Sequence, residues 1–426
     1  MNRIINYLHR LLRILRDGLA HVLMGEIFAK VMRFLASAII VRALDKSSYG
    51  IWTYLTNLVS LIFLFDGFGI KWGVLHFCSK DINDSEKYRI YRFGMIYGLL
   101  ADSLLAIVSL ILIFSFKTPF RVSFDVVVAF LVLQCVGFVF DINMSFLRAS
   151  NLQNIYGLIK GMYNAIYFSL IATTVFKLGI YGILVSEFIS TVIATIFVSK
   201  YILPKRYERK SSGIIKKDKF DFKRIVKTSA LSSVSSSISQ LLYLIDTLLI
   251  AYLLKAPNVL ATYKVATIIP FNLTFIPISI SGFFYPKLSY YGDDTTQIRS
   301  KARMLIFNML ILNTVIVLPV IVFSKRIVSF MFGEKYIESS VLMNILLVGY
   351  LFASSLRIPI SHVLSAMGAL KQNLVNAILS GLANVLLDVI LISKYGSVGA
   401  AVATSSIFIL SSLINLFSFL KILRNR

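Results

Sequence analysis

The amino-acid sequence predicts an all-α integral membrane protein with about twelve transmembrane helices, arranged as two parallel six-helix lobes around a central cavity. Of the 426 residues, 57% are apolar and only 15% are charged, whereas soluble proteins are ~25% charged. The apolar residues form continuous runs, and a helix needs ~20 such residues to span a bilayer. Continuous runs also exclude an outer-membrane β-barrel, whose strands alternate apolar and polar residues.

The predicted spans follow from the apolar runs and from the polar and turn residues that separate them. The N-terminal lobe covers residues 19–203 and the C-terminal lobe covers residues 225–420. The spans lie near residues 19–43, 50–77, 90–115, 124–148, 153–176, 179–203, 226–253, 259–286, 303–323, 337–357, 372–393 and 396–420.

Three basic segments lie outside the spans. Residues 1–18 place four arginines among leucines and isoleucines, which predicts an amphipathic helix on the membrane surface. Residues 204–224 carry nine Lys or Arg against three acids and predict a cytoplasmic linker between the lobes, and residues 421–426 form a basic tail. By the positive-inside rule, both termini and the linker should be cytoplasmic in a multi-pass protein of the inner, cytoplasmic cell membrane.

An internal repeat supports the division into two lobes. Residues 147–182 resemble residues 364–399 at a constant offset of 217 residues, so that Gly179 matches Gly396 and Gly182 matches Gly399. Because six helices per half is an even number, both halves enter the membrane from the same side. The sequence therefore predicts parallel repeats, as in transporters whose two lobes rock around a central site.

The first predicted helix carries charged residues where a membrane helix should be apolar. Its polar positions are spaced by four, three and four residues, which places them on one helix face. They are Glu26, Lys30, Arg33 and Ser37. Each charge costs ~2.5–3.5 kcal/mol on the insertion scale, so this face should line a wet cavity. The alternative is a pair between Glu26 and Lys30 within the helix, which still leaves Arg33 positive and suited to an anionic ligand.

The seventh predicted helix, the counterpart of the first in the repeat, has a polar stripe with the same spacing. The stripe contains Ser236, Gln240, Tyr243 and Thr247, and Asp246 lies beside it. Small polar residues are also common where membrane helices pack closely. Cavity lining is the interpretation adopted here, with helix packing as the alternative.

Two further lysines lie near breaks in the second and eighth predicted helices. Lys71 follows the sequence DGFG, which begins at Asp66, and Lys264 precedes Pro270 and Pro277. Interrupted helices in corresponding positions of two halves indicate a midplane site. We therefore expect Asp66, Lys71 and Lys264 to line the cavity. Other intramembrane ionisable residues, which are functional candidates by default, are Asp102, Asp141, Lys160, Glu187 and Asp388.

The sequence contains no pattern that predicts an enzyme. It has no GxxxxGK[ST] nucleotide-binding loop, no catalytic triad, and no spaced His and Cys ligands for a metal. The net charge of +24 fits the positive-inside rule better than nucleic-acid binding. No cofactor is therefore expected, whereas coupling to H⁺ or Na⁺ through the intramembrane acids is left open.

At this point the chain resembles a family, the polysaccharide or O-antigen-type oligosaccharide-lipid flippases of the multidrug/oligosaccharidyl-lipid/polysaccharide exporter superfamily. The resemblance covers nearly the whole chain. It depends on these segments in this order: IIVRALDKSSYGIWTYL, FDGFG, LIDTLLIAYLL, IPISISGFFYPKLSYY, FGEKYIESSVLMNILLVGY and LSAMGALKQNLVNAILSGLANVLLDVILISKYGSVGAAVAT.

The resemblance implies a polyprenyl-pyrophosphate-linked glycan as cargo, moved from the inner to the outer leaflet by alternating access. Cationic cavity residues would hold the pyrophosphate, and Glu26, Lys30 and Arg33 fit by position and charge. The expected partners are this substrate, membrane lipids and glycan polymerase or assembly enzymes. The alternatives are a cation-coupled multidrug exporter, whose cavity should be acidic, a peptidoglycan-precursor flippase, which commonly has two more helices, and a non-transporting scaffold.

Overall fold

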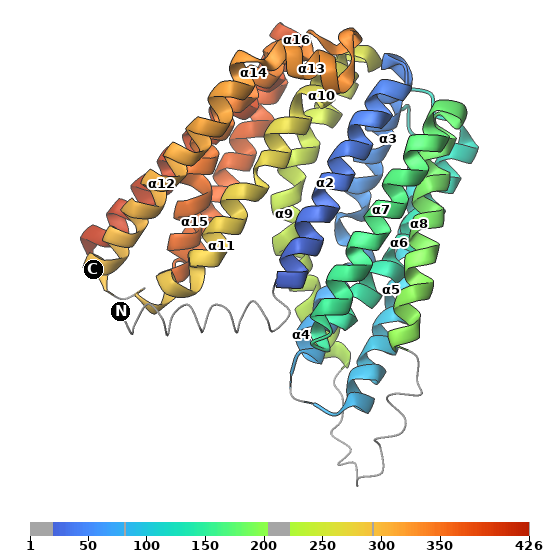
Figure 1. Cartoon of the computed structure of the whole chain (residues 1–426), viewed down its shortest axis with the longest axis horizontal. Coiled ribbons are helices and arrows are strands. Elements are labelled where there is room, and N and C mark those ends of the chain that lie inside the picture. The colour runs from blue at the N-terminus through green and yellow to red at the C-terminus, as the bar shows by residue number, and fades with distance from the viewer. Residues whose placement is uncertain (1–19, 81, 203–221, 292–293, 426) are drawn as a thin grey trace. The chain divides into compact units, whose positions relative to one another are not determined.

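The chain folds into α-helices with short connections (Figure 1), as seen in a computed structural model that describes residues 20–80, 82–202, 222–291 and 294–425. The predicted amphipathic helix 1–18 lies outside the described residues, as do residues 204–221 of the linker. Within the described ranges no residue is in a β-strand. The first half contains α2 (Ala20–Ala43), α3 (Lys46–Ile62), η2 (Phe63–Gly69), α4 (Ile70–Cys78), α5 (Asp84–Ser115), α6 (Phe124–Ala149), α7 (Gln153–Leu178) and α8 (Ile180–Ile202).

The second half begins within the described residues at α9 (Phe222–Leu254). It continues with α10 (Pro257–Leu273), α11 (Phe275–Tyr290), α12 (Thr295–Val322), α13 (Ser324–Phe332), η5 (Glu334–Tyr336), α14 (Ser339–Phe352), the π-helix η6 (Ala353–Arg357), α15 (Ile358–Ala366) and α16 (Leu370–Asn425). Each of the twelve predicted spans therefore falls on a helical segment, and the all-α multi-pass fold is confirmed.

Eight described helical stretches are long and apolar enough to cross a membrane, and the stretch Leu370–Arg424 covers two of the predicted spans. The other three predicted spans coincide with α2, α7 and α9, which are more polar. In α9 only Leu244–Leu254 forms a shorter apolar stretch. Polar residues in a membrane helix are costly unless they serve a site, so these three helices are where a functional site should be sought.

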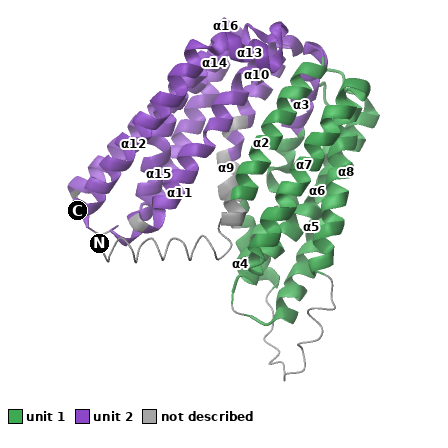
Figure 2. Ribbon diagram, viewed as in Figure 1, with its two compact units in different colours: residues 1–44, 59–237 green, residues 45–58, 238–426 purple. Residues whose placement is uncertain are grey.

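The described chain forms two compact units (Figure 2). Unit 1 contains residues 1–44 and 59–237, and unit 2 contains residues 45–58 and 238–426. These units differ from the lobes expected from the sequence in two segments. Residues 45–58 join unit 2, and residues 225–237, the first part of α9, join unit 1.

Each unit has its own apolar core. In unit 1, fully buried Ile70, Ile142 and Phe146 pack together with residues of α5, α7 and α8. In unit 2, Ile298, Ile360 and Leu364 form a buried cluster. A close-packed interior of this kind fixes helices against one another, so that each unit can hold polar side chains in defined positions.

The internal repeat is visible in the backbone. Gly179 ends α7 with φ 56° and ψ −128°, and Gly396 breaks α16 with φ 61° and ψ −139°. Such left-handed geometry favours glycine. Three residues later, a Cβ on Gly182 would meet the carbonyl of Thr174, and one on Gly399 would meet that of Leu391, which is 217 residues further on. The repeat therefore preserves a helix–turn–helix geometry in both units.

The two expected helix breaks are also present. In η2, Gly67, Phe68 and Gly69 have φ values of 54°, 46° and 74°, so three consecutive residues adopt the left-handed conformation between α3 and α4. The break between α10 and α11 falls at Thr274, four residues after Pro270 and three before Pro277. Pro277 has no N–H for the carbonyl of Leu273, and the hydroxyl of Tyr350 donates to that carbonyl at 3.0 Å.

Candidate functional site

Helix α2 lies in unit 1 beside α7 (Figure 1), and side chains of its charged face contact α7. The facing side of α7 has a polar stripe with the same four-three-four spacing as Glu26, Lys30, Arg33 and Ser37 on α2. It consists of Tyr156, Lys160, Tyr163 and Tyr167. Equal spacing keeps the two stripes in register, because both helices present a residue about once per turn. The polar residues of α2 thus find polar partners inside the unit.

Arg33 is the centre of the first polar cluster, which we call the Arg33 cluster (Arg33, Tyr163, Asn164, Tyr167 and Glu187). Its Nη1 and Nη2 donate to the two carboxylate oxygens of Glu187 at 2.8 and 2.7 Å. Its Nε donates to Oδ1 of Asn164 at 2.9 Å, and Nη2 also donates to the hydroxyl of Tyr163 at 2.5 Å. The guanidinium lies over the ring of Tyr167, with Cζ 4.1 Å from the centroid.

This geometry uses most of the donors that an arginine has. A bidentate arginine–carboxylate pair is among the strong charge-assisted interactions, and the ring of Tyr167 adds a cation–π contact. The side chains of Arg33 and Glu187 are 39% and 21% exposed. An anionic ligand therefore has access to Arg33, but it must compete with Glu187 for the guanidinium.

Glu26 pairs with another helix, not with Lys30. Nζ of Lys160 donates to Oε1 of Glu26 at 2.5 Å, and the hydroxyl of Tyr156 donates to the same oxygen at 2.8 Å. Lys30 is exposed and acts electrostatically on Glu26. Ser37 donates to the carbonyl of Phe34 in its own helix. Lys30 is therefore the most accessible cation of the α2 stripe.

The break at η2 gathers a second set of ionisable groups in unit 1. Lys71 in α4 pairs with Asp66 in η2 and with Asp141 in α6, the latter at 3.0 Å. Asp102 in α5 is completely buried, and its Oδ1 accepts from the backbone N–H of Gly67 at 2.6 Å. The structure thus pairs Asp66 with Lys71 and brings Asp102 and Asp141 to the same break, whereas their expected role in lining a cavity stays a prediction.

Unit 2 holds a different polar cluster around Asp246 of α9, which we call the Asp246 cluster (Asp246, Tyr263, Asn384, Asp388 and Thr404). Asp246 is 2% exposed and Asp388 is 0% exposed. Oδ2 of Asp246 accepts from the hydroxyls of Tyr263 at 2.9 Å and Thr404 at 2.5 Å. The amide of Asn384 donates to Oδ1 of Asp246 at 3.1 Å and also to Asp388.

The Asp246 cluster places two carboxylates in one buried site. Oδ1 of Asp388 is buried without a hydrogen-bond partner, and Asp246 and Asp388 accept hydrogen bonds from the same amide, that of Asn384. Lys264 from α10 acts on Asp246 electrostatically. One lysine does not neutralise two carboxylates. Since two adjacent buried carboxylates cannot both stay ionised without compensation, the arrangement suits a bound proton or a small cation.

The rest of the predicted stripe in α9 has mixed outcomes. Gln240 is exposed, and Thr247 is buried. Ser236 and Tyr243 lie in α9, but their side chains are outside what the structure describes. Ser236 belongs to unit 1, whereas Gln240, Tyr243 and Asp246 belong to unit 2. Asp246, which lies beside the stripe, is held by hydrogen bonds from α10 and α16, and cavity lining by the stripe itself stays a prediction.

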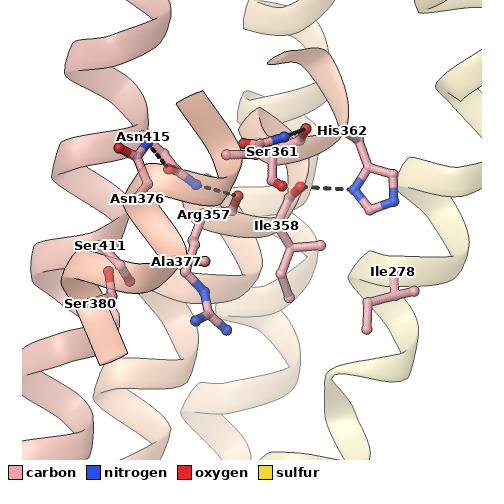
Figure 3. Close-up of a pocket in the computed structure, with 11 residues that line it drawn as sticks. Ile278, Arg357, Ile358, Ser361, His362, Asn376, Ala377, Ser380, Ser411 and Asn415 are labelled. Carbon is pink, nitrogen blue, oxygen red and sulfur yellow. Dashed lines mark hydrogen bonds between the residues drawn. The ribbon is translucent and has the colours of Figure 1, made fainter. Parts of the chain in front are cut away.

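Unit 2 also contains a pocket of about 250 Å³ between α11, η6, α15 and α16 (Figure 3). Arg357 and His362 are its ionisable lining residues, and asparagines and serines of α15 and α16 form most of its wall. The sequence patterns did not predict any residue of this pocket. Arg357 and His362 belong to no polar stripe or motif in the sequence, and they face the asparagines and serines of α16 only because the helices pack together.

Some residues that contact the predicted site residues could have been predicted from their spacing in the sequence. The stripe from Tyr156 to Tyr167 has the same spacing as the α2 stripe. Asn384 and Asp388 are four residues apart and thus share a helix face. Thr404 follows Glu187 by 217 residues, the offset of the repeat. Spacing and symmetry therefore point to these positions, although contacts between helices are needed to assign them to one site.

Solved structures with the same architecture are membrane transporters. A multidrug resistance MATE family transporter of the MOP superfamily, in an inward-facing conformation, superposes with a TM-score of 0.71 at 12% identity, covering 95% of this chain and 98% of that one. The lipid II flippase MurJ, in an inward closed conformation, gives a TM-score of 0.73 at 18% identity and covers 95% of this chain and 90% of that one. The fold is therefore that of these transporters.

The chain belongs to the polysaccharide biosynthesis protein family, whose family model it matches over residues 39–341. A protein of Shigella flexneri named as an O-antigen transporter is 29% identical over 223 residues, 52% of each chain. A protein of Haloferax volcanii named as a low-salt glycan biosynthesis flippase is 26% identical over 211 residues, 48% of this chain and 44% of that protein. The matched segments thus span about half the length of these relatives.

Proposed function

We propose that this protein flips a polyprenyl-pyrophosphate-linked oligosaccharide from the cytoplasmic to the outer leaflet for surface polysaccharide synthesis, by alternating access of its two units. The observation that carries the proposal is family membership over residues 39–341. The names of the Shigella and Haloferax relatives support a glycan linked to lipid as the cargo. Because multidrug transporters and lipid II flippases share the fold, the fold alone does not select the cargo.

The polar residues of the membrane helices offer the polar contacts that the head group of such a cargo needs. Its sugar and pyrophosphate head cannot cross hydrocarbon without polar contacts, since unsatisfied polar groups in an apolar medium cost several kcal/mol. Lys30 is exposed on α2, and Arg33 lies one turn further along the same face. We assign the first contact with pyrophosphate to Lys30, because its side chain is exposed, whereas Arg33 is partly buried and paired with Glu187.

The direct test is a deletion strain in which lipid-linked glycans are measured on each leaflet. Loss of the protein should cause one lipid-linked oligosaccharide to accumulate on the cytoplasmic side, and the wild-type chain should restore export. Lys30→Gln should slow export about tenfold, because a charged hydrogen bond contributes ~1.5–3 kcal/mol and 1.4 kcal/mol is tenfold. Lys177→Gln, which removes an exposed lysine at the end of α7, is the matched control. Unchanged glycan distribution in the deletion strain would exclude the function.

We further propose that the Asp246 cluster holds the coupling cation, a proton or Na⁺. Two buried carboxylates and two hydroxyls offer hard oxygen ligands of the kind that alkali ions prefer, and one protonated carboxyl would serve equally to relieve the repulsion. Transport of the glycan against its gradient would then draw on the cation gradient across the membrane.

Thermal unfolding of the purified protein in nanodiscs distinguishes the two cations. A ligand that binds only the folded state raises its stability by RT ln(1 + [L]/Kd). If Na⁺ is the ion, replacing choline chloride by NaCl at constant ionic strength should raise the unfolding temperature, and Asp388→Asn should abolish the rise. If the coupling ion is a proton, acidification in the absence of Na⁺ should raise the unfolding temperature, and Asp388→Asn should abolish this rise. Asp141→Asn, a half-exposed carboxylate of unit 1, controls for general charge effects, and no response to either ion refutes the coupling site.

We also propose that both termini and the segment 204–224 face the cytoplasm. The basic residues of 204–224 and of the C-terminal tail support this orientation, because cytoplasmic loops are enriched in Lys and Arg. Reporter fusions after Arg426 and at Lys216 should remain on the cytoplasmic side. An exported reporter at either position contradicts the orientation.

A further inference from the structure

The pocket of unit 2 combines a cation with neutral hydrogen-bonding groups (Figure 3). The guanidinium of Arg357 projects from η6 toward α16, and Ser380 and Ser411 lie on the α16 wall. Among the described residues that line it, Arg357 and His362 are ionisable and no carboxylate is present. The local potential therefore favours an anionic group over a cationic one.

Hydrogen bonds hold the polar wall in a defined geometry. The amide of Asn376 donates to Oδ1 of Asn415 at 2.7 Å, and Nδ2 of Asn415 donates to the backbone carbonyl of Arg357 at 3.2 Å. Asn376 and Asn415 are 7% and 5% exposed. The two segments of α16 and the π-helix η6 are thus tied together at the pocket. A π-helix within an α-helix frequently marks a functional site.

Part of the polar wall is not satisfied by the protein itself. The hydroxyl of Ser380, which is 4% exposed, and Oδ1 of Asn373 are buried without a hydrogen-bond partner. A buried polar group without a partner costs about 1–3 kcal/mol. Both residues line the pocket, so a ligand with hydroxyl groups would satisfy atoms that the fold leaves unpaired.

We propose that this pocket binds one anionic monosaccharide unit, meaning a sugar ring that carries a carboxylate or a phosphate. The guanidinium of Arg357 would bind the anionic group, and the amide and hydroxyl groups of Asn373, Asn376 and Ser380 would bind ring hydroxyls. A volume of about 250 Å³ lies below the ~300–1,000 Å³ of pockets for drug-sized ligands. It therefore has room for one sugar ring. This inference rests on the proposed function, because it identifies the unit as part of the transported glycan.

Saturation-transfer difference NMR on the purified chain in nanodiscs tests the pocket with small probes. The observed probes are glucuronate, glucose 1-phosphate and glucose, and inorganic phosphate serves as a competitor. We expect glucuronate or glucose 1-phosphate to receive at least fivefold more saturation than glucose, and the stronger of the two identifies the anionic group. Equal signals from glucose and both anionic sugars refute the role of charge. If inorganic phosphate displaces glucose 1-phosphate as effectively as unlabelled competing sugar phosphate at the same concentration, sugar recognition is refuted.

Substitutions in and outside the pocket test whether the anionic sugar binds there. Arg357→Gln should reduce the signal of the anionic sugar at least fivefold, and Ala377→Leu should do the same by filling the pocket. Lys371→Gln removes an exposed cation at the start of α16 and should leave the signal unchanged. The unfolding temperature of each variant shows whether it is folded. If both pocket variants are folded and retain the signal, the pocket is not the binding site.

The deletion strain separates this inference from the proposed function. If glycan export requires the protein but Arg357→Gln exports at the wild-type rate, the pocket inference fails and the flippase function stands. If deletion of the protein leaves the glycan on the same leaflet as before, the flippase function fails, whatever the probes show.

Discussion

The Arg33 cluster of unit 1 and the Asp246 cluster of unit 2 occupy related places in the repeat but have opposite charge. In unit 1 the central residue is a cation, and Glu187 neutralises it from α8. In unit 2 the central residue is an anion, and Thr404 occupies the position 217 residues after Glu187. Thr404 donates a hydrogen bond to Asp246, so a hydroxyl stands where unit 1 has a carboxylate.

The two clusters differ in how their charge is balanced. We call the Arg33 cluster closed because its charges cancel within the protein, and the Asp246 cluster open because it has more carboxylates than cations. Arg33 acts as a tethered cation for Glu187, so this cluster is neutral without any dissolved ion. The Asp246 cluster contains Asp388 as a second carboxylate, and its nearest lysine, Lys264, compensates only one charge. The duplicated helix arrangement thus holds an ion pair in one copy and two buried carboxylates in the other, and the second copy is where we propose an exchangeable ion.

The largest expected effect comes from breaking the ion pair of unit 1. Arg33→Gln leaves the carboxylate of Glu187 without its guanidinium, and Glu187→Gln does the converse. Removing one partner of a fully buried pair costs ~3–5 kcal/mol, and partial exposure of both side chains reduces this to about 3 kcal/mol. Denaturation of the purified protein in detergent with SDS should show this loss for each single variant.

The double variant Arg33→Met/Glu187→Met sharpens this experiment. If the pair is a tethered counter-ion, the double variant should be more stable than either single variant, because no uncompensated charge remains. Additive losses would show instead that Arg33 and Glu187 act independently. Such a result would contradict the interpretation that the Arg33–Glu187 pair neutralises its own cluster.

The next effect concerns the helix break of unit 1. Gly69→Ala should destabilise the protein by about 2 kcal/mol, because Gly69 has φ 74° and a left-handed residue with a Cβ costs ~1–2 kcal/mol. Its Cβ would also lie 2.5 Å from the carbonyl oxygen of Ser229. The same SDS titration measures the loss.

Gly137→Ala is the matched control for this substitution. Gly137 lies within α6, and a Cβ there meets nothing within 4 Å. Alanine should stabilise the helix by ~0.5–1 kcal/mol. If both substitutions have the same effect, the left-handed conformation of η2 does not constrain the fold.

Sequence patterns were sufficient to predict the helices and the polar face of α2. Continuous apolar runs define the spans, and the four-three-four spacing places Glu26, Lys30 and Arg33 on one face. DGFG and the two prolines predicted the positions of both helix breaks. These features depend on residues that are neighbours along one helix, where geometry follows directly from spacing.

The partners of the charged residues were not predictable in the same way. Glu187 and Asn164 reach Arg33 from two other helices, and Asp388 reaches Asp246 from α16. A single sequence shows that such residues are ionisable or polar but not which of them meet, because helix packing determines the contacts. The sequence therefore favoured anion binding by Arg33, whereas the structure shows the guanidinium already paired with Glu187.

A smaller effect is expected at the helix break of unit 2. Tyr350→Phe removes the hydroxyl that donates to the carbonyl of Leu273, the carbonyl left without its helical donor by Pro277. A buried unsatisfied carbonyl costs about 1–3 kcal/mol. The substitution also removes the hydrogen bond between the Tyr350 hydroxyl and Oδ1 of Asn313. We expect a loss of about 1.5 kcal/mol in the SDS titration. Tyr395→Phe, at an exposed tyrosine of α16, should change the stability by less than ~0.5 kcal/mol, and equal losses would contradict a role for Tyr350 at the break.

The smallest effect on stability, and one of opposite sign, is expected for the open cluster of unit 2. Asp388→Asn removes one of two adjacent carboxylates and keeps the size of the side chain, so it relieves the repulsion between them. In buffer without Na⁺ at pH 7, the variant should be as stable as the wild type or up to ~1 kcal/mol more stable. Arg33→Gln in the same buffer should be less stable. If Asp388→Asn is instead destabilised as strongly as Arg33→Gln, Asp388 is part of a closed network like that of Glu187, and the contrast between an exchangeable and a tethered ion is wrong.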